Sequence, residues 1–203
     1  MSSIMIVAQV LILSLLNVSH TSEASVLSQM MSLGCYVQNG FNNNLPLPQS
    51  SPLPRIHCDD KGLTSVPRDL PSTLFELQLP NNALTTFPCL ALPYLNNMIL
   101  NHNSITYFPW YCLKNMPSLV HLDLSHNQLF CVYLYRVKYF VPNLKRVDVS
   151  YNNLKKLSEC DLGWNAYVPN GLHRPFEAVI AGNPFHCDCN LIWVITSAIN
   201  VEK

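Results

Sequence analysis

Aliphatic residues recur along this chain in a short alternating pattern that ends on an asparagine. The stretch LVHLDLSHNQL places Leu119, Leu122 and Leu124 before Asn127. Alternation with a period of two is typical of a β-strand, whose successive side chains point to opposite faces. The arrangement occurs four times, and the asparagines at positions 82, 103, 127 and 152 are spaced by 21, 24 and 25 residues. A repeat of this length predicts a stack of similar units rather than the strands of an ordinary sandwich. The other copies have aliphatic residues at Leu74, Leu77 and Leu79, at Leu95, Met98 and Leu100, and at Leu144, Val147 and Val149.

An asparagine at the same place after every strand indicates a structural role. Each turn draws backbone N–H and C=O groups away from water, and a buried group left unpaired costs about 1–3 kcal/mol. An asparagine side chain carries both a donor and an acceptor, so it can pair with its own turn and with a neighbouring one. We therefore interpret Asn82, Asn103, Asn127 and Asn152 as a structural ladder and not as binding residues.

The template L-x-x-L-x-L-x-x-N-x-L resembles that of the leucine-rich repeat family. The resemblance implies an α/β fold, a leucine-rich repeat solenoid. Its curved parallel β-sheet would form the concave face, with loops and short helical turns on the convex face. About four full repeats would occupy residues 72–174, with a cap at each end. One repeat cannot enclose its own leucines, so neighbouring repeats would share a single core.

A cysteine-containing segment before the repeats resembles the N-terminal cap of extracellular members of the family. The stretch LPRIHC carries a degenerate copy, with Leu53, Ile56 and Cys58 in the strand positions. The resemblance implies a cap with a proline- and asparagine-rich loop over residues 25–71, closed by a disulfide between Cys35 and Cys58.

A second cysteine-containing segment, AGNPFHCDCNLIW, resembles the start of a C-terminal cap. This partial cap would cover residues 175–203, with Asn183 in the ladder position. Such caps supply two further cysteines as partners, and no cysteine follows Cys189 here. We therefore expect either a truncated chain or other partners for Cys187 and Cys189.

The remaining disulfide pairings stay open at the level of sequence. Cys160 is one candidate partner for the cap cysteines. Cys89 and Cys112 fall at similar offsets in neighbouring repeats and could face each other on the convex side. Once Cys35 and Cys58 are paired, six of the eight cysteines remain, and six allow 15 pairings.

The N-terminus predicts export from the cell. Residues 4–18 form a mainly apolar run of 15 residues, followed by the small residues Ser22 and Ala24, which is typical of a secretory signal peptide over residues 1–24. A membrane span needs about 20 apolar residues, and no later segment qualifies. The predicted localisation is secreted or extracellular, or cell-surface if the chain is a fragment with a membrane anchor beyond Lys203.

Charge and motifs exclude several function classes. Twelve basic residues balance twelve acidic ones without a basic block, so we expect no nucleic-acid partner. No catalytic or phosphate-binding signature occurs, and we expect neither an enzyme nor a cofactor. The sequence HCDC at 186–189 could ligate zinc, but an oxidising compartment favours disulfides over a metal site.

Polar residues on the outward face of the predicted strands form a candidate ligand-binding surface. It would lie on the concave sheet or its edge, and it consists of His121, Asp123, His126, Arg146, Asp148 and Tyr151. The competing interpretations are a solvated sheet face and an acid–base or metal site. The histidines could also make binding depend on pH between about 5 and 7.

The resemblance implies a non-enzymatic protein-recognition module. It would act like the ectodomains of Toll-like receptors, Slit proteins and adhesion proteins, with a protein or glycan ligand on the concave sheet. The alternative is a structural leucine-rich repeat protein of the extracellular matrix. Fold alone does not choose a ligand.

Overall fold

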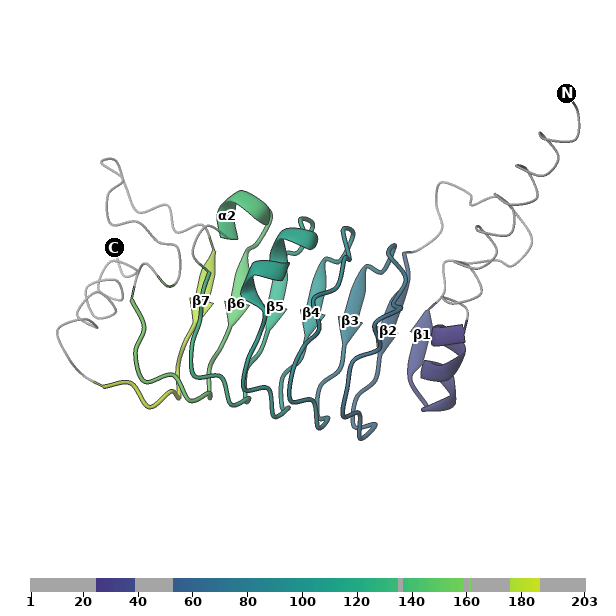
Figure 1. Ribbon diagram of the computed structural model, residues 1–203, viewed down its shortest axis with the longest axis horizontal. Helices are drawn as coiled ribbons and strands as arrows, with labels where there is room; N and C mark the ends of the chain where they lie inside the picture. Colours follow the sequence, from purple (N-terminus) through teal and green to yellow (C-terminus); the bar gives the residue numbers. More distant parts are fainter. Residues whose placement is uncertain (1–24, 39–52, 135–136, 159–160, 162–175, 187–203) are drawn as a thin grey trace, which may run out of the picture.

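The structure is a computed structural model that describes residues 25–38, 53–134, 137–158, 161 and 176–186. In these ranges, seven strands of three residues form one sheet whose order follows the chain (Figure 1). The first pairing is antiparallel and every later one is parallel. Parallel neighbours in chain order require the backbone to wind round once per strand, which confirms the predicted leucine-rich repeat solenoid. The strands are β1 (Tyr36–Gln38), β2 (Arg55–His57), β3 (Glu76–Gln78), β4 (Asn97–Ile99), β5 (His121–Asp123), β6 (Arg146–Asp148) and β7 (Glu177–Val179).

The aliphatic positions of the repeats line one continuous core. The central residue of each strand from β3 to β6 is at most 1% exposed and pairs in register with the next. These residues are Leu77, Met98, Leu122 and Val147. Burying one such side chain contributes about 1.5–3 kcal/mol, and each shares its contacts with the coils on both sides.

Repeat length explains the two short helices on the convex side. The interval from Asn82 to Asn103 has 21 residues and contains no helix, whereas the intervals of 24 and 25 residues contain η1 (Trp110–Asn115) and α2 (Val137–Phe140). The three or four additional residues equal about one helical turn. Within η1, Trp110 and Leu113 are buried, so the extra turn covers the core as well as lengthening the coil.

The N-terminal end of the core is closed by a helical turn and an antiparallel strand. Residues 25–32 are helical and bury Met30 completely, with its sulfur 4.0 Å from that of Cys58. A disulfide joins Cys35, just before β1, to Cys58, just after β2. Antiparallel pairing ends the parallel array here, so the first coil does not expose its apolar side.

One predicted inward position is wrong. Leu53 is 43% exposed, and the neighbouring Pro54 is buried instead. The carbonyl of Pro54 accepts a hydrogen bond of 2.9 Å from the N–H of Phe75 in the next coil. Proline has no N–H to satisfy, so it enters the core at this end of the sheet without leaving a donor unpaired.

The asparagines connect neighbouring coils through their side-chain amides. Asn152 is 5% exposed, and its Nδ2 donates to the carbonyls of Leu124, Val149 and Ser150 at 2.9–3.1 Å. Its Oδ1 accepts from the N–H of Leu129 at 2.9 Å. Asn103 and Asn127 show the same pattern of one acceptor contact and several donor contacts. At Asn82 and Asn183 the Oδ1 accepts from two backbone N–H groups, and the Nδ2 again donates to several carbonyls.

A second disulfide joins Cys89 to Cys112 in neighbouring coils on the convex side. The predicted partners Cys160, Cys187 and Cys189 lie outside the described residues, as do residues 1–24, where a signal peptide is predicted. Throughout the ranges that the structure describes, no helix combines the length and the apolar character needed to cross a membrane.

We expect the Asn152→Ala substitution to lower the free energy of unfolding by about 2–3 kcal/mol, because it leaves the Leu129 N–H and interior carbonyls without a partner. The matched control is Asn153→Ala, since Asn153 is the same residue type with an exposed side chain. That change should stay within about 0.5 kcal/mol of the wild type. Chemical denaturation followed by circular dichroism measures both, and equal losses would contradict a structural role for the ladder.

Candidate functional site

Four of the six predicted surface residues lie together on the concave face of the sheet. His121 and Asp123 are the outer residues of β5, and Arg146 and Asp148 are those of β6. In-register pairing puts His121 beside Arg146 and Asp123 beside Asp148. Side chains alternate along a strand, so the two residues that flank the buried central residue of each strand both point to the outward face.

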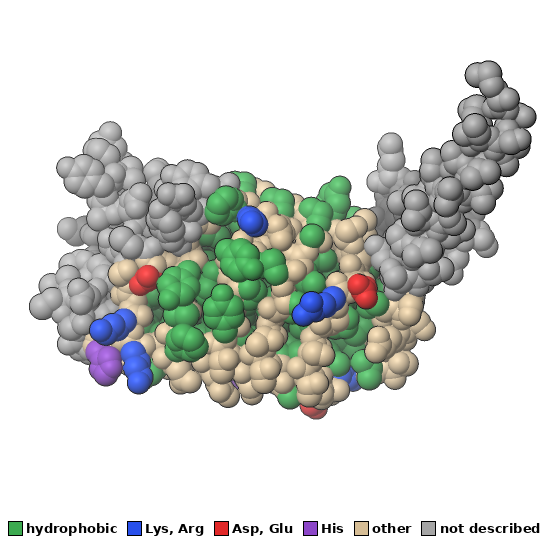
Figure 2. Space-filling view, viewed as in Figure 1, with side chains coloured by type: hydrophobic (Ala, Val, Ile, Leu, Met, Phe, Trp, Pro, Cys, Tyr) green, Lys and Arg blue, Asp and Glu red, His purple; other side chains and the backbone are tan. Residues whose placement is uncertain are grey.

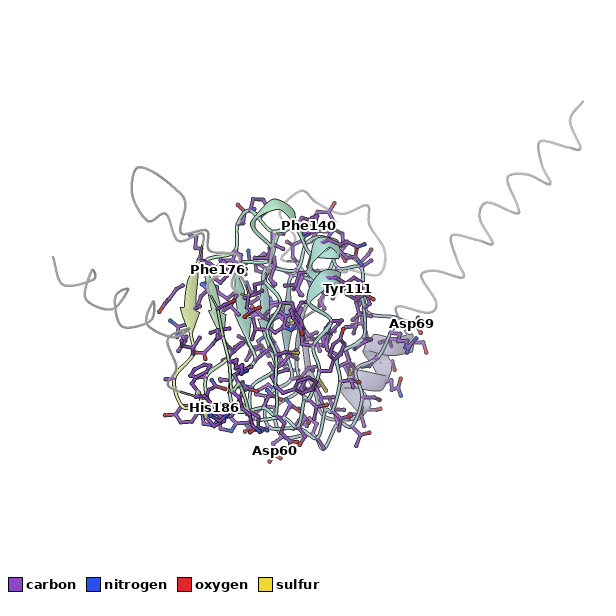
Figure 3. All side chains as sticks on the ribbon, turned by 60° about the vertical axis from the view of Figure 1, so that its left-hand side comes forward. Asp60, Asp69, Tyr111, Phe140, Phe176 and His186 are labelled. Atoms are coloured by element: carbon purple, nitrogen blue, oxygen red, sulfur yellow. A yellow bond between two sulfur atoms is a disulfide. The ribbon has the colours of Figure 1, made fainter. Side chains whose placement is uncertain are left out.

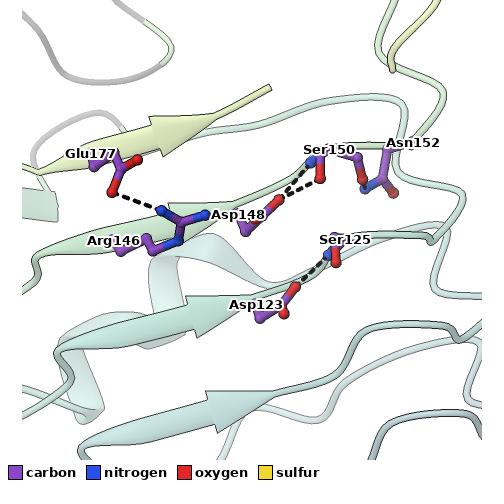
Figure 4. A network of polar contacts seen from close by, with 7 residues as sticks. All are labelled: Asp123, Ser125, Arg146, Asp148, Ser150, Asn152 and Glu177. Carbon is purple, nitrogen blue, oxygen red and sulfur yellow. Dashed lines mark hydrogen bonds and ion pairs between the residues drawn. The ribbon is translucent and has the colours of Figure 1, made fainter. Parts of the chain in front are cut away.

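Hydrogen bonds hold the charged groups of this face in place (Figure 4). The Nη1 of Arg146 lies 2.8 Å from Oε2 of Glu177 on β7, and its Nη2 lies 3.2 Å from Oδ2 of Asp148. Asp148 Oδ1 also accepts from the N–H and the hydroxyl of Ser150. The guanidinium is thus clamped between two carboxylates, one of which is itself fixed by the following turn.

The charge of Arg146 is secure in this arrangement. Partial burial acts to lower the pKa of Arg146, but its hydrogen bonds and attraction to Glu177 and Asp148 outweigh that effect and raise the pKa. The side chain remains 43% exposed, and that of Glu177 is 61% exposed. Both signs of charge are therefore accessible at fixed positions on this part of the sheet.

Asp123 and His121 extend the network toward β4. Asp123 Oδ1 accepts from the N–H of Ser125 at 2.9 Å, which fixes the carboxylate as Ser150 fixes that of Asp148. His121 is exposed, and its Nδ1 lies 3.1 Å from Oδ1 of Asn97. We call His121, Asp123, Arg146, Asp148 and Glu177 the concave network.

The other two predicted residues, His126 and Tyr151, lie at the edge of the sheet. Each immediately precedes a ladder asparagine and has a positive φ, of 52° and 53°. Their rings stack at a centroid distance of 4.4 Å, and His102 stacks on the other side of His126 at 4.1 Å. This aromatic row follows the axis of the solenoid along one edge and is separate from the concave network.

Gly182 ends the aromatic row. It precedes the ladder residue Asn183 and has a φ of +68°. A Cβ at this position would lie 2.5 Å from Cδ1 of Tyr151. The ring of Tyr151 therefore occupies the space that a side chain on the last coil would need, and glycine also allows the left-handed backbone.

A second polar network at the N-terminal end of the concave face was not predicted. The carboxylate of Glu76 on β3 is buried and lies 3.0 Å from Nη1 of Arg55 and 3.4 Å from Nε2 of His57. Gln78 donates to the same carboxylate. Partly exposed Ile99 on β4 and polar Asn97 separate this cluster from the concave network.

Sequence reasoning also missed Glu177 and left His102 out of the candidate surface. Glu177 is paired in register with Arg146, but 31 residues separate them and the strand around Glu177 departs from the template. A usable signal existed for His102, because it holds the same offset before Asn103 that His126 holds before Asn127.

Metal-binding groups and free thiols can be assessed over the described residues. No three His, Cys, Asp or Glu side chains in these ranges are placed to hold a metal ion. Cys131 is the one unpaired cysteine among those described. Burial raises the pKa of the Cys131 thiol, and Asp161 raises it further against the opposing hydrogen bond with Tyr133. A raised pKa reduces the fraction of thiolate, which is the nucleophilic form of cysteine.

Comparison with known proteins gives a consistent result. Residues 72–129 match the family described as Leucine rich repeat. The chain is 30% identical over 142 residues to Protein halfway of Drosophila melanogaster, covering 70% of this chain and 20% of that protein. It is 27% identical over 136 residues to Leucine-rich repeat-containing protein 3 of Danio rerio, with coverages of 67% and 40%. It is 29% identical over 103 residues to Leucine-rich repeat and fibronectin type-III domain-containing protein 4 of Rattus norvegicus, with coverages of 51% and 16%. The chain therefore spans 40% or less of the length of these three relatives.

We expect Gly182→Ala to lower the free energy of unfolding by about 3 kcal/mol, since it combines a left-handed backbone with a clash against Tyr151. Gly62→Ala is the matched control, because Gly62 has a φ of +64° but no atom lies within 4 Å of where its alanine Cβ would be. The control should lose only about 1 kcal/mol. Thermal and urea unfolding measure both.

The clash can be isolated with a double variant. Adding Tyr151→Ala to Gly182→Ala removes the ring, so the combined loss should be smaller than the sum of the two single losses. Additive losses would mean that the ring of Tyr151 does not pack over Gly182.

Proposed function

We propose that this chain, which is a leucine-rich repeat protein, is a non-enzymatic module that binds a protein ligand through its concave network. The observation that carries the proposal is the clamp on Arg146, which lies between Asp148 and Glu177 yet stays accessible. Fixed charges of both signs can pair with polar groups of a partner without first being ordered, and this reduces the entropic cost of binding.

The energetics favour a binding role for these ion pairs over a stabilising one. Partly exposed ion pairs contribute about 0–1 kcal/mol to folding. The same groups can matter more in a complex, because a partner would exclude water from around them. Arginine is also enriched among the residues that dominate interface energies. The network therefore has more to contribute to a complex than to the free chain.

We further propose that the module acts outside the cell, either secreted or at the cell surface. Two disulfides within the described residues support this, because disulfides persist in oxidising compartments. The apolar run at residues 4–18 supports entry into the secretory route. A structural role in the extracellular matrix has no observation of its own in its favour, and we do not propose it.

A screen of the purified chain against a panel of secreted and cell-surface ectodomains tests the proposal. We expect Arg146→Ala to lower the binding affinity for each protein partner found in the screen by about thirtyfold, which corresponds to a loss of about 2 kcal/mol at an interface hot spot. The loss of unfolding free energy should stay below about 1 kcal/mol. Biolayer interferometry and chemical denaturation measure the two quantities.

Arg68→Ala is the matched control for this experiment, since Arg68 is an exposed arginine outside the sheet. It should leave both binding and stability unchanged. If partners bind Arg146→Ala and Arg68→Ala equally well, the concave network is not the binding site. If a partner no longer binds once its glycans have been removed, the ligand is a carbohydrate and not a protein.

A further inference from the structure

The charges of the concave network do not balance. Arg146 brings one positive charge, whereas Asp123, Asp148 and Glu177 bring three negative ones, which leaves a net charge of −2 when His121 is neutral. The whole chain has a formal net charge of +0, so this surface is acidic relative to the rest of the molecule. A ligand that approaches the concave network therefore meets an excess of negative charge.

Asp123 is the carboxylate whose charge is left without a cationic partner. The guanidinium of Arg146 contacts two other carboxylates, and the imidazole of His121 lies 3.1 Å from Oδ1 of Asn97. Among the described residues, no ion pair reaches Asp123, and its hydrogen bond comes from the backbone N–H of Ser125 (Figure 4). The second oxygen of this carboxylate is thus available to a ligand.

A second carboxylate lies next to Asp123 and is held there. Asp148 pairs with Asp123 in register, and neighbouring strands are about 4.8 Å apart. Like charges directly opposite each other on two strands repel. The backbone N–H groups of Ser125 and Ser150 each hold one carboxylate oxygen, so neither side chain can turn away. A cation placed between the two carboxylates would relieve this repulsion.

An aliphatic side chain lies on the other side of Asp123. Ile99 pairs in register with Gln78 and with Asp123, and it is partly exposed on the concave sheet. Lysine and arginine side chains cover apolar surface with their methylene stem and keep the charged head in a polar environment. Across three strands, or roughly 10 Å, the row of Ile99, Asp123 and Asp148 offers one apolar contact followed by two carboxylates.

The other ion-pair network of the sheet shows how a carboxylate is neutralised within the chain. The side chain of Glu76 is 7% exposed, and it lies 3.0 Å from Nη1 of Arg55 and 3.4 Å from Nε2 of His57. These partners leave little of the Glu76 carboxylate for a ligand. The same sheet therefore holds one carboxylate satisfied by the chain itself and another, Asp123, that is not.

The concave sheet differs in its charges from the face over the coils that carry η1 and α2. Figure 2 shows hydrophobic side chains gathered in the middle of that face, with charged side chains scattered around them. On the concave side, three fixed carboxylates come from three consecutive strands. A cationic group of a ligand is therefore attracted to the concave side.

We propose that the concave network binds a lysine or arginine side chain of a protein ligand, with the stem of that side chain on Ile99 and its charged head between Asp123 and Asp148. This inference rests on the proposed function, because it names the chemistry of the ligand at the same site. An acidic segment fits less well, since Arg146 already has two carboxylate partners.

Selection of a phage-displayed library of random peptides on the purified full chain tests the proposal. The enriched peptides should share a lysine or an arginine. Isothermal titration calorimetry with the synthetic peptides should show at least about a tenfold loss of affinity for Asp123→Asn. Asparagine keeps the shape of the side chain and its acceptor for the Ser125 N–H but removes the charge.

A double-mutant cycle identifies the contact itself. Replacing the basic residue of the peptide by norleucine should weaken binding to the wild type by about as much as Asp123→Asn does. The two changes together should cost less than the product of the separate factors, because either one removes the same interaction. Losses that multiply would place the basic residue elsewhere and overturn the proposal.

Asp69→Asn is the matched control, since Asp69 is an exposed aspartate outside the sheet. Figure 3 shows Asp69 far from Phe176, the residue that precedes β7. This variant should bind the peptides as the wild type does. If Asp123→Asn fails to fold, Ile99→Thr replaces it, and the loss of affinity should be roughly fourfold, as expected for about one buried CH₂ group.

The outcomes separate this inference from the proposed function. Enriched peptides without a basic residue, no enriched peptide, or equal binding by Asp123→Asn and the wild type would each overturn the inference. A partner that is sensitive to Arg146→Ala but not to Asp123→Asn keeps the concave network as the binding site and overturns only the basic ligand. Calcium ions that bind the wild type alone, with no basic peptide selected, would replace the peptide side chain by a metal ion.

Discussion

The pairing of backbone groups between coils by asparagine amides is the interaction on which the rest of the fold depends. A coil that turns into the core must leave N–H and C=O groups without water, and no apolar side chain can satisfy them. Asn152 meets both needs at once, because its Oδ1 accepts from one coil while its Nδ2 donates to carbonyls of two. The same amide thereby fixes how far each coil is rotated relative to the next. In the strands the same alignment appears as in-register pairing, with Leu122 beside Val147 and Asp123 beside Asp148.

This alignment turns a local offset into continuous surfaces. A residue type that recurs at one offset from the ladder becomes a column or row in space, as the stack of His102, His126 and Tyr151 illustrates. The inward columns are restricted to aliphatic residues, because any change there disturbs two neighbours. The outward columns carry no such restriction, so each pair of coils can hold its own polar arrangement. The ion pairs of Glu76 at one end and of Arg146 at the other are two different polar arrangements on the same sheet.

The strands, the core and the ladder were predictable from the sequence because they depend on short-range patterns. Period-two alternation identifies the buried face, and an asparagine at a constant offset identifies the turn. Leu53 was predicted wrongly because the antiparallel β1 stands where a preceding coil would be. The repeat template assumes a coil on both sides and does not apply there. Arg146 was predicted as a surface residue, but its clamp needs Glu177 from a strand with a degraded pattern. The left-handed φ of His126 and Tyr151, which moves them to the edge, is also invisible to a pattern of hydrophobic and polar residues.

The position of the concave network follows from the same construction. Register places Asp123 beside Asp148 and Arg146 beside Glu177, so the charged groups come from three consecutive coils. None of these side chains is part of the core, and their ion pairs contribute little to folding because they stay partly exposed. A substitution there can therefore change binding with little effect on the fold, whereas a substitution in the asparagine ladder changes the alignment of the coils and every surface that depends on it.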